Sequence, residues 1–233
     1  MKLYEFEGTE LFRKEGINGP DYAIASTPAE AREKAEEIGL AVVVKAQVLT
    51  GGRYLAGGVQ TAETPEKVEE ITQRILGTTI GGLEIPCVMV ARRVTAVQEF
   101  YLGVTIDDYQ GTPVAILSAA GGVSVNEVAR DHPEWVASQN VPITTGLSLY
   151  EAKQMAHNVG LSGRDLVNVA ETLTRLYKVF RSNDALIAEI NPLIRTSEGR
   201  YLALDSKVEV DDSSLYRHTE LNLDKNKRIL NPL

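Results

Sequence analysis

The chain has 233 residues, enough for one large domain or two small lobes with a sizeable core. Its hydrophobic fraction of 43% and charged fraction of 24% are ordinary for a globular protein. The 24 Lys and Arg residues against 32 Asp and Glu residues give a formal net charge of −8. This balance argues against a nucleic-acid groove, which needs concentrated positive charge, but leaves room for a local basic pocket.

The N-terminal segment MKLYEFEGTELFRKEG carries charges throughout and has no apolar core, so it is unlike a secretory signal. No stretch reaches the ~18 apolar residues typical of a membrane-spanning helix. The single cysteine, Cys87, lies in the apolar run IPCVMV and is expected to be an inert, buried thiol. One thiol without a disulfide framework is typical of a reducing compartment. We therefore expect a cytoplasmic protein whose partners are neither nucleic acid nor membrane.

Start and stop signals predict four helices. Two Thr-Pro starts open helices over 27–39 and 64–77, each ended by a glycine, and Ser148 opens a third. Glu30 and Glu151 are placed to complete capping boxes. A fourth, amphipathic helix is indicated by an apolar stripe within DLVNVAETLTRLYKVF, made of Leu166, Val169, Ala170, Leu173, Leu176, Tyr177 and Phe180.

Apolar and alternating runs predict seven strands, with a hairpin turn at DDYQGTP. Because several neighbouring strands look hairpin-linked, the pattern favours the α+β class over a doubly wound parallel sheet. The sequence has neither a Walker-type loop nor a strand that leads into a dinucleotide fingerprint. The strands are expected at 41–46, 56–62, 86–94, 98–107, 113–119, 185–194 and 200–208.

The first candidate site is KAQVLTGGRYLAGG, which follows an apolar strand. The aliphatic part of the Lys45 side chain either lies along the surface at the strand end, or the side chain points into a cleft. The glycines let backbone N–H groups approach an anion, and Arg53 can add a bidentate contact to phosphate. A plain hairpin turn explains the glycines equally well, so the residues alone leave both readings open.

The second candidate is AEINPL, where Glu189 and Asn191 lie two residues apart on a strand and so face the same way. Fourteen residues after Asn191, Asp205 ends another apolar strand. Oxygen ligands from two strand ends suit Mg²⁺, which combines one or two protein carboxylates with substrate phosphates. A structural hydrogen-bonded pair is the equally weighted alternative. Glu99, at the start of QEFYLG, looks by itself like a solvated strand residue.

The three histidines, His132, His157 and His218, lack metal-ligand spacing and a glycine-rich or cysteine-rich context. Chemistry carried by a histidine of this chain is therefore not expected.

Taken together, the motifs resemble the ATP-grasp half of the β subunit of succinyl-CoA synthetase, the ADP- or GDP-forming type. The resemblance covers essentially the whole chain and implies an α+β ATP-grasp fold with two lobes around a nucleotide cleft, lobe A at about 21–94 and lobe B at about 1–20 plus 95–233. It rests on these segments, in order: YEFEGTELFRKEGI, VVKAQVLTGGRYLAGGV, EFYLGVTID, AGGVSVNEVA, ALIAEINPLI and LDSKVEVDDSSLYRH.

The resemblance also implies roles for individual residues. Magnesium ligation would fall to Asn191 and Asp205, and catalysis to Glu189, near the phosphoryl-transfer centre, together with Arg53. Phosphoryl transfer needs mainly positioning and charge neutralisation, which such a set supplies. The nucleotide, ATP/ADP or GTP/GDP, would be bound by Lys45, Gly52, Arg53, Tyr54, Val94 and Glu99.

The chain departs from the family pattern in three places. Tyr54 and Leu55 stand where the family usually has Gly and Lys, which makes the loop bulkier and less basic. Ala91 stands where a glutamate usually reads the nucleotide, and AAGG at 119–122 replaces TEGG, so Ala120 removes a carboxylate. These departures favour weakened catalysis or a different acid substrate.

The resemblance implies the nucleotide-binding component of an acid–thiol ligase like succinate–CoA ligase. Phosphoryl groups would pass to a histidine on an α-like partner subunit, which also holds the CoA site. The family's CoA-ligase domain is missing after KNKRILNPL, which fits either a shortened chain or a naturally split subunit with a separate ligase domain. The alternatives are a non-catalytic module that binds nucleotide or a partner, and a related ligase for another carboxylic acid.

Overall fold

The computed structural model describes residues 1–223, which fall into two compact units. The larger unit contains Met1–Gly19 and the described residues from Thr95 onward, and the smaller unit contains Pro20–Val94. Residues 224–233, which the sequence assigns to the second lobe, lie outside the described residues. None of the described helices is both long and apolar enough to cross a membrane.

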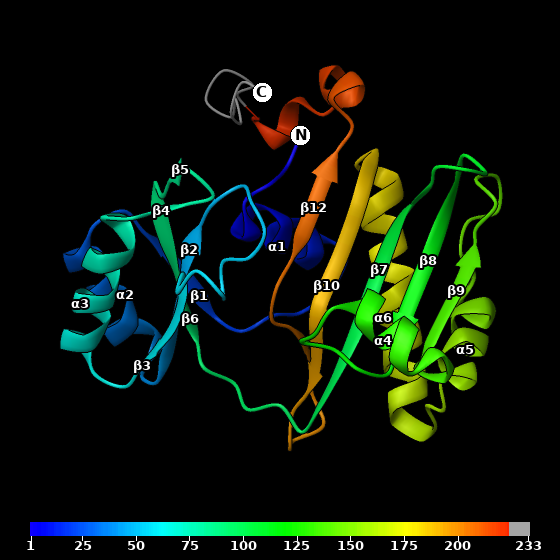
Figure 1. Ribbon diagram of the computed structural model, residues 1–233, viewed down its shortest axis with the longest axis horizontal. Coiled ribbons are helices and arrows are strands. Elements are labelled where there is room, and N and C mark those ends of the chain that lie inside the picture. Colours follow the sequence, from blue (N-terminus) through cyan, green and yellow to red (C-terminus); the bar gives the residue numbers. More distant parts are fainter. Residues whose placement is uncertain (224–233) are drawn as a thin grey trace. The chain divides into compact units, whose positions relative to one another are not determined.

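The smaller unit is a four-stranded antiparallel sheet with two helices on one face (Figure 1). The strand order is β1 (Tyr22–Ala25), β6 (Cys87–Arg92), β2 (Val42–Gln47), β3 (Val59–Ala62). The helices are α2 (Pro28–Ile38) and α3 (Pro65–Leu76), and a short hairpin of β4 (Thr79–Ile80) and β5 (Leu83–Glu84) follows them. Alternate strand residues meet the helices in one apolar core, which includes Val42, Val44, Ala46, Val88, Val90, Ala31, Ala35, Val68 and Ile71.

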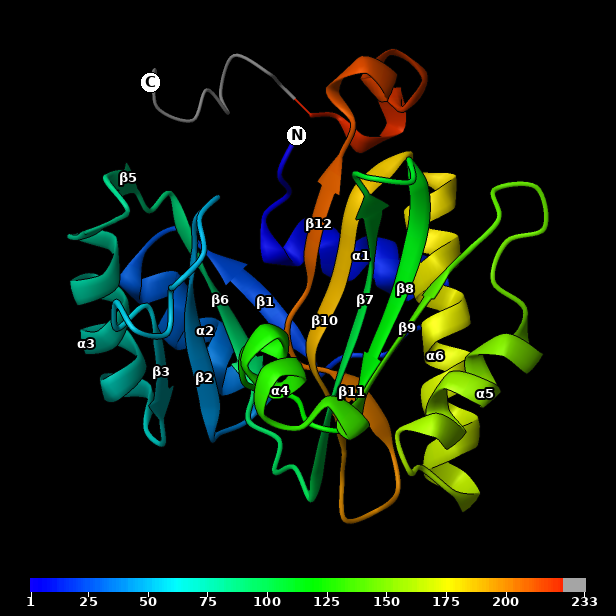
Figure 2. The same ribbon diagram turned by 45° about the vertical axis from the view of Figure 1, so that its right-hand side comes forward.

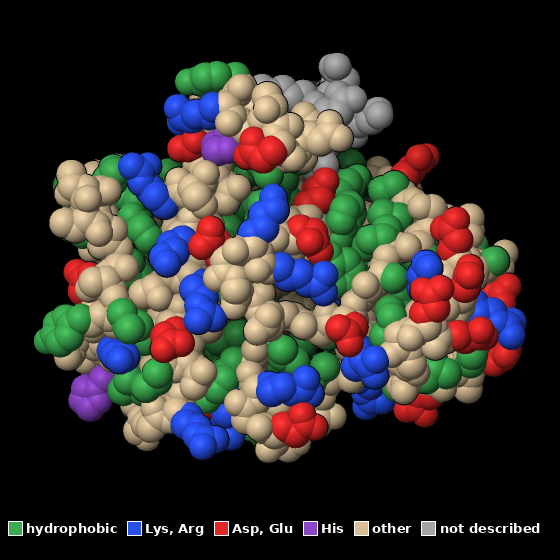
Figure 3. Space-filling model, turned by 180° about the vertical axis from the view of Figure 1, so that it is seen from behind, with side chains coloured by type: hydrophobic (Ala, Val, Ile, Leu, Met, Phe, Trp, Pro, Cys, Tyr) green, Lys and Arg blue, Asp and Glu red, His purple; other side chains and the backbone are tan. Residues whose placement is uncertain are grey.

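The predicted caps of α2 and α3 are confirmed, with one difference. Thr27 accepts from the Glu30 N–H at 3.2 Å, and Thr64 accepts from the Lys67 N–H at 3.3 Å. Glu30, however, accepts from the N–H of Ser26 and not from that of the cap, so the predicted reciprocal box is displaced by one residue. On the surface, Arg32 of α2 bridges to acidic side chains of α3, and charged side chains of both signs cover this helical layer (Figure 3).

The larger unit is a six-stranded antiparallel sheet in the order β11, β10, β7, β8, β9, with β12 also paired to β10. One face is covered by α1, α5 and α6, as Figure 2 shows, and holds the main core. The strands are β7 (Gln98–Asp107), β8 (Thr112–Ser118), β9 (Val136–Asn140), β10 (Ala185–Arg195), β11 (Tyr201–Ala203) and β12 (Lys207–Val210). The helices are α1 (Glu5–Lys14), α4 (Val125–Asp131), α5 (Leu149–Asn158) and α6 (Gly163–Ser182), with 3₁₀ turns at Pro133–Trp135, Asp212–Arg217 and Thr219–Leu221.

The α+β class and the seven predicted strand regions are confirmed. One of these regions, however, was predicted as a single strand and forms two. The expected run 200–208 is broken into β11 and β12, which pair with different parts of β10. The sequence did not predict α1, β1, β4, β5, α4 or β9. The edge strand β9 has the polar sequence VASQN and α1 buries Glu5 and Thr9, so neither shows a clean apolar period.

Candidate active site

The sheet of the larger unit has one polar face, opposite its helices. Phe100, Leu102, Ala188 and Ile190 belong to the core on the helical side. Because strand side chains alternate, Glu99, Tyr101 and Gly103 of β7 and Glu189 of β10 face the other way. The predicted residues Glu99 and Glu189 are thus displayed on the same face by neighbouring strands, with Gly103 directly opposite Glu189 in the register.

Asn191 and Asp205 are brought together by the hairpin from β10 to β11. The N–H of Leu204 donates to the carbonyl of Pro192 at 3.0 Å, so the residues on either side of this bond are near neighbours. The β10–β7 register shifts between Ile190 and Leu193, around Asn191. An amide and a carboxylate at such neighbouring backbone positions are oxygen ligands of the kind that Mg²⁺ shares with phosphates. Among residues 1–223, no cluster of three or more His, Cys, Asp or Glu side chains is arranged so that it could hold a metal ion.

The Asn191 amide also holds a loop. Its Oδ1 accepts from the N–H of Gly122 at 2.8 Å, and its Nδ2 donates to the carbonyl of Val123 at 3.1 Å. We call residues 119–124 the clamped loop. An amide oxygen has two lone pairs, so Oδ1 can keep this bond and still face a cation. The loop contacts fix the direction in which that oxygen points, as partners of metal ligands commonly do.

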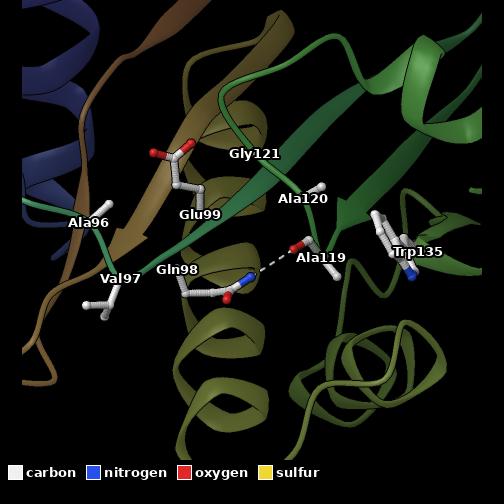
Figure 4. Close-up of a pocket in the computed structure, with 8 residues that line it drawn as sticks. All are labelled: Ala96, Val97, Gln98, Glu99, Ala119, Ala120, Gly121 and Trp135. Atoms are coloured by element: carbon white, nitrogen blue, oxygen red, sulfur yellow. Dashed lines mark hydrogen bonds between the residues drawn. The ribbon is translucent and has the colours of Figure 1, made fainter.

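Glu99 lies against the clamped loop. A Cβ added at Gly122, whose φ is +72°, would fall 2.3 Å from the Glu99 Oε2 atom. In Figure 4 the Glu99 carboxylate points away from Gln98, whose amide donates to the carbonyl of Ala119 at 3.2 Å. A cavity of about 530 Å³ borders the same segments. It is lined by Ala96, Val97, Gln98, Glu99, Ala119, Ala120, Gly121 and Trp135.

Glu189 has two neighbours on the polar face. The Tyr101 hydroxyl lies above Gly103, which is directly opposite Glu189 in the register, and the Lys207 ammonium lies 3.5 Å from Oε2. Burial, followed by the charge of Glu189, raises the pKa of Tyr101 well above its usual range. The sequence prediction missed Tyr101. Its place two residues after Glu99 on an alternating strand was the available signal.

In the smaller unit, Lys45 lies inside β2, which continues to Gln47. The strand thus ends one residue beyond the predicted bound of 46. Val44 and Ala46 face the helices, so Lys45 and its cross-strand neighbour Met89 face the opposite side. Lys45 is half-buried there. Ala91, at one of the departures from the family, lies farther along β6 on this same face.

The segment 51–58, which we call the arginine loop, connects β2 to β3. The two strands do form an antiparallel hairpin, and the loop closes through bonds from the Gly58 N–H to the Arg53 carbonyl and from the Ala46 N–H to the Gly58 carbonyl. The Arg53 guanidinium donates to the carbonyl of Ala46 at 3.1 Å. The tip projects outward, since Tyr54 is 76% and Leu55 91% exposed.

The end of β6 is held by its own unit. Arg92 donates to the carbonyl of Ile38 and pairs with Asp21, and Arg93 pairs with Glu63 at 3.2 Å. Both guanidinium groups are thus engaged within the smaller unit. Val94, which follows directly, is half-buried and carries the backbone out of the strand.

Two of the three histidines have structural partners. His132 stacks on Trp135 with ring centroids 4.1 Å apart. His218 contacts Asp184 at 2.6 Å and Glu220 at 3.3 Å, and Asp184 also pairs with Arg217 at 2.7 Å. These contacts engage both ring nitrogens of His218.

Comparison with solved structures shows the fold. A dinucleotide-forming acetyl-coenzyme A synthetase from Ca. Korarchaeum cryptofilum, solved with coenzyme A and Ca-AMPCP, matches 90% of this chain and 93% of its own at a TM-score of 0.74 and 23% identity. The ATP citrate lyase of Methanothrix soehngenii, solved with citrate and coenzyme A, matches 100% of this chain and 55% of its own at a TM-score of 0.73 and 19% identity.

Sequence comparison shows the family. The model of the ATP-grasp domain matches residues 2–195. The β subunit of ADP-forming succinate–CoA ligase from Roseiflexus sp. (strain RS-1) is 43% identical over 222 residues, and the GDP-forming β subunit from Thermus thermophilus is 41% identical over 221. Each match covers 95% of this chain but 59% and 58% of the relative, so the chain spans under two thirds of their length. The chain belongs to the ATP-grasp family and, as its motifs predicted, resembles the ATP-grasp part of succinate–CoA ligase β subunits.

Proposed function

We propose that this chain is the nucleotide-binding component of a nucleoside-diphosphate-forming acyl-CoA synthetase. In this role it supports phosphoryl transfer between ATP or GTP and a histidine on an α-like partner subunit. The observation that carries the proposal is the polar face of the larger sheet. Two of its strands present Glu99, Glu189 and Asn191, and the segment after β11 adds Asp205. The chain that carries them is more than 40% identical to β subunits of that reaction class.

Each unit supplies different chemistry. In the smaller unit, Lys45 contacts phosphate, and the N–H groups of Gly52, Arg53 and Tyr54 bind phosphate oxygens, with the Arg53 charge as support. Val94 contributes its backbone, and Glu99 of the larger unit binds the ribose end of the nucleotide. Both ADP- and GDP-forming relatives match, so the base is not specified by the family alone.

Asn191 and Asp205 would hold Mg²⁺ together with the nucleotide phosphates. When bound, the ion neutralises developing charge on the phosphoryl group. Glu189 orients the incoming acceptor group, and the clamped loop holds the Asn191 oxygen in place. The acceptor histidine and the CoA site belong to the partner subunit.

The decisive experiment mixes the full chain with the α-like subunit, magnesium and γ-labelled ATP or GTP, and follows acid-labile label on the partner. Label on a histidine of the partner is expected, and its absence, in a mixture that binds nucleotide, would contradict the proposal. The chain alone is expected to make no acyl-CoA from ATP, CoA and succinate. Turnover by the chain alone near ~1–10³ s⁻¹, the ordinary enzyme range, would point to a stand-alone ligase.

Two variants test the assigned residues by calorimetry. Lys45→Ala should weaken nucleotide binding without moving the thermal transition, whereas lost stability with intact affinity would make Lys45 a structural residue. Asp205→Asn should reduce magnesium-dependent nucleotide affinity by more than the ~10–100-fold typical of losing an outer partner of a metal ligand. Equal affinities with and without magnesium, in both proteins, would remove the metal assignment.

A second candidate is a regulatory module that binds nucleotide without transferring phosphate. It is favoured by Ala91 and Ala120, which replace carboxylates of the family pattern, and by the exposed Tyr54 and Leu55. In the labelling experiment this candidate predicts nucleotide binding with no label on the partner.

A further inference from the structure

We propose that Tyr101 is a positioning residue for Glu189: its hydroxyl holds the Glu189 carboxylate in one orientation on the polar face, and Gly103 provides the space that makes this contact possible. The inference rests on the proposed function, because it gives Glu189 the role in phosphoryl transfer described above. The contact itself is a property of the larger unit and can be tested separately.

The backbone places the three residues in a fixed relation. Tyr101 and Gly103 lie two apart on β7 and so share a face, and Gly103 is directly opposite Glu189 on β10. Residues directly opposite in an antiparallel pair have their Cβ positions about 4.5–5.5 Å apart. A hydroxyl lying above Gly103 is therefore within reach of the Glu189 carboxylate.

The Tyr101 ring lies above Gly103. A Cβ built on Gly103 would be 2.6 Å from the Tyr101 Oη atom and 3.0 Å from Cε1. Gly103 has no positive φ that would call for glycine, so what glycine supplies here is the space beside its Cα. The ring is buried, with 6% of the residue exposed, which leaves it little freedom to move away from Glu189.

The other neighbour of Glu189 cannot fix its orientation equally well. Lys207 approaches Oε2 at 3.5 Å, but its side chain is 59% exposed against 21% for Glu189. An exposed ammonium on a flexible stem holds a carboxylate weakly. Tyr101 reaches the same carboxylate from a rigid, buried ring, and burial beside that charge also raises the pKa of the hydroxyl, which therefore remains a donor.

The test compares Tyr101→Phe with Tyr177→Phe, in the full chain assembled with its α-like partner. Tyr177 is also buried, at 5% exposed, and its hydroxyl has no hydrogen-bond partner within residues 1–223, so it is a matched control. Tyr101→Phe should lower kcat for phosphoryl transfer by about 10–100-fold, as when an outer partner of a metal ligand is lost, with the nucleotide KM unchanged. Tyr177→Phe should leave both unchanged.

Further variants separate positioning from folding. Gly103→Ala should reproduce the kcat loss, because the methyl group displaces the ring. In a Glu189→Gln background, Tyr101→Phe should cause no further loss, since a residue that acts through another is not additive with it. Equal losses in both backgrounds, or a fall in kcat matched by a rise in KM, would overturn the positioning role.

A readout without catalysis tests the contact directly. With ¹³C-labelled glutamate carboxylates, the Glu189 signal is the one missing in Glu189→Gln, and it should shift in Tyr101→Phe but not in Tyr177→Phe. An unmoved signal would overturn the contact. If the wild-type assembly transfers no phosphoryl group while the signal shifts as expected, the proposed function fails and the contact stands without its catalytic role.

Discussion

The arginine loop and the clamped loop are both rich in glycine, but they use it for opposite purposes. In the arginine loop, a Cβ at Gly51 or Gly52 would meet no atom within 4 Å. In the clamped loop, a Cβ at Gly121 would fall 2.5–2.8 Å from backbone atoms of Phe100. The arginine loop thus leaves its backbone open at 51–52, although Gly58 at its other end packs closely against Ile80 and Ala46. The clamped loop packs its backbone against a strand.

The difference extends to what holds each loop. The arginine loop is closed by backbone bonds between its own ends and by the Arg53 contact to Ala46. The clamped loop is held from outside, by the Asn191 amide of β10. Glycine clusters thus mark either an open backbone for a ligand or a closely packed one, and the sequence pattern does not distinguish these cases.

The largest expected effect comes from Gly121→Ala. The added methyl group overlaps backbone, which cannot rotate away, so we expect a loss of about 2–3 kcal/mol in the free energy of unfolding. Gly51→Ala is the matched substitution in the arginine loop and should leave stability unchanged to within about 0.5 kcal/mol. Urea unfolding of both proteins measures the contrast. Equal stabilities would show that the two loops do not differ as described.

A smaller effect is expected from Asn191→Ala, which removes both side-chain bonds to the clamped loop. We expect a loss of about 1–2 kcal/mol, together with faster hydrogen exchange at the Gly122 amide, which loses its acceptor. Amides of the arginine loop serve as the internal control and should exchange as in wild type. Unchanged protection at Gly122 would mean that the loop does not depend on this clamp.

The smallest effect on stability is expected from Leu55→Lys, at the tip of the arginine loop. Leu55 is 91% exposed, so unfolding should change by less than about 0.5 kcal/mol. A positive charge near the proposed phosphate site should nevertheless tighten nucleotide binding severalfold, more at low than at high salt. Calorimetry at two salt concentrations measures this. Unchanged affinity at low salt would argue that this tip does not approach phosphate.

The sequence determined the capped helices, the longer strands and the family. Thr27, Thr64 and Ser148 start the predicted helices because their hydroxyls satisfy N–H groups three residues ahead, a contact that requires no other part of the chain. Alternation placed Glu189 on a polar face for the same local reason. The string of motifs from YEFEG to LYRH led to the ATP-grasp family, which the family match confirms.

The tertiary structure decided what depends on partners distant in sequence. The pairing that sets Gly103 opposite Glu189 joins residues 86 positions apart in the chain, and the bonds from Asn191 to Gly122 and Val123 span 69 and 68. The break between β11 and β12 likewise follows from their pairing to different parts of β10. Cross-strand register and close packing of glycine against a neighbouring strand are set when the sheet assembles, so no local pattern carries them.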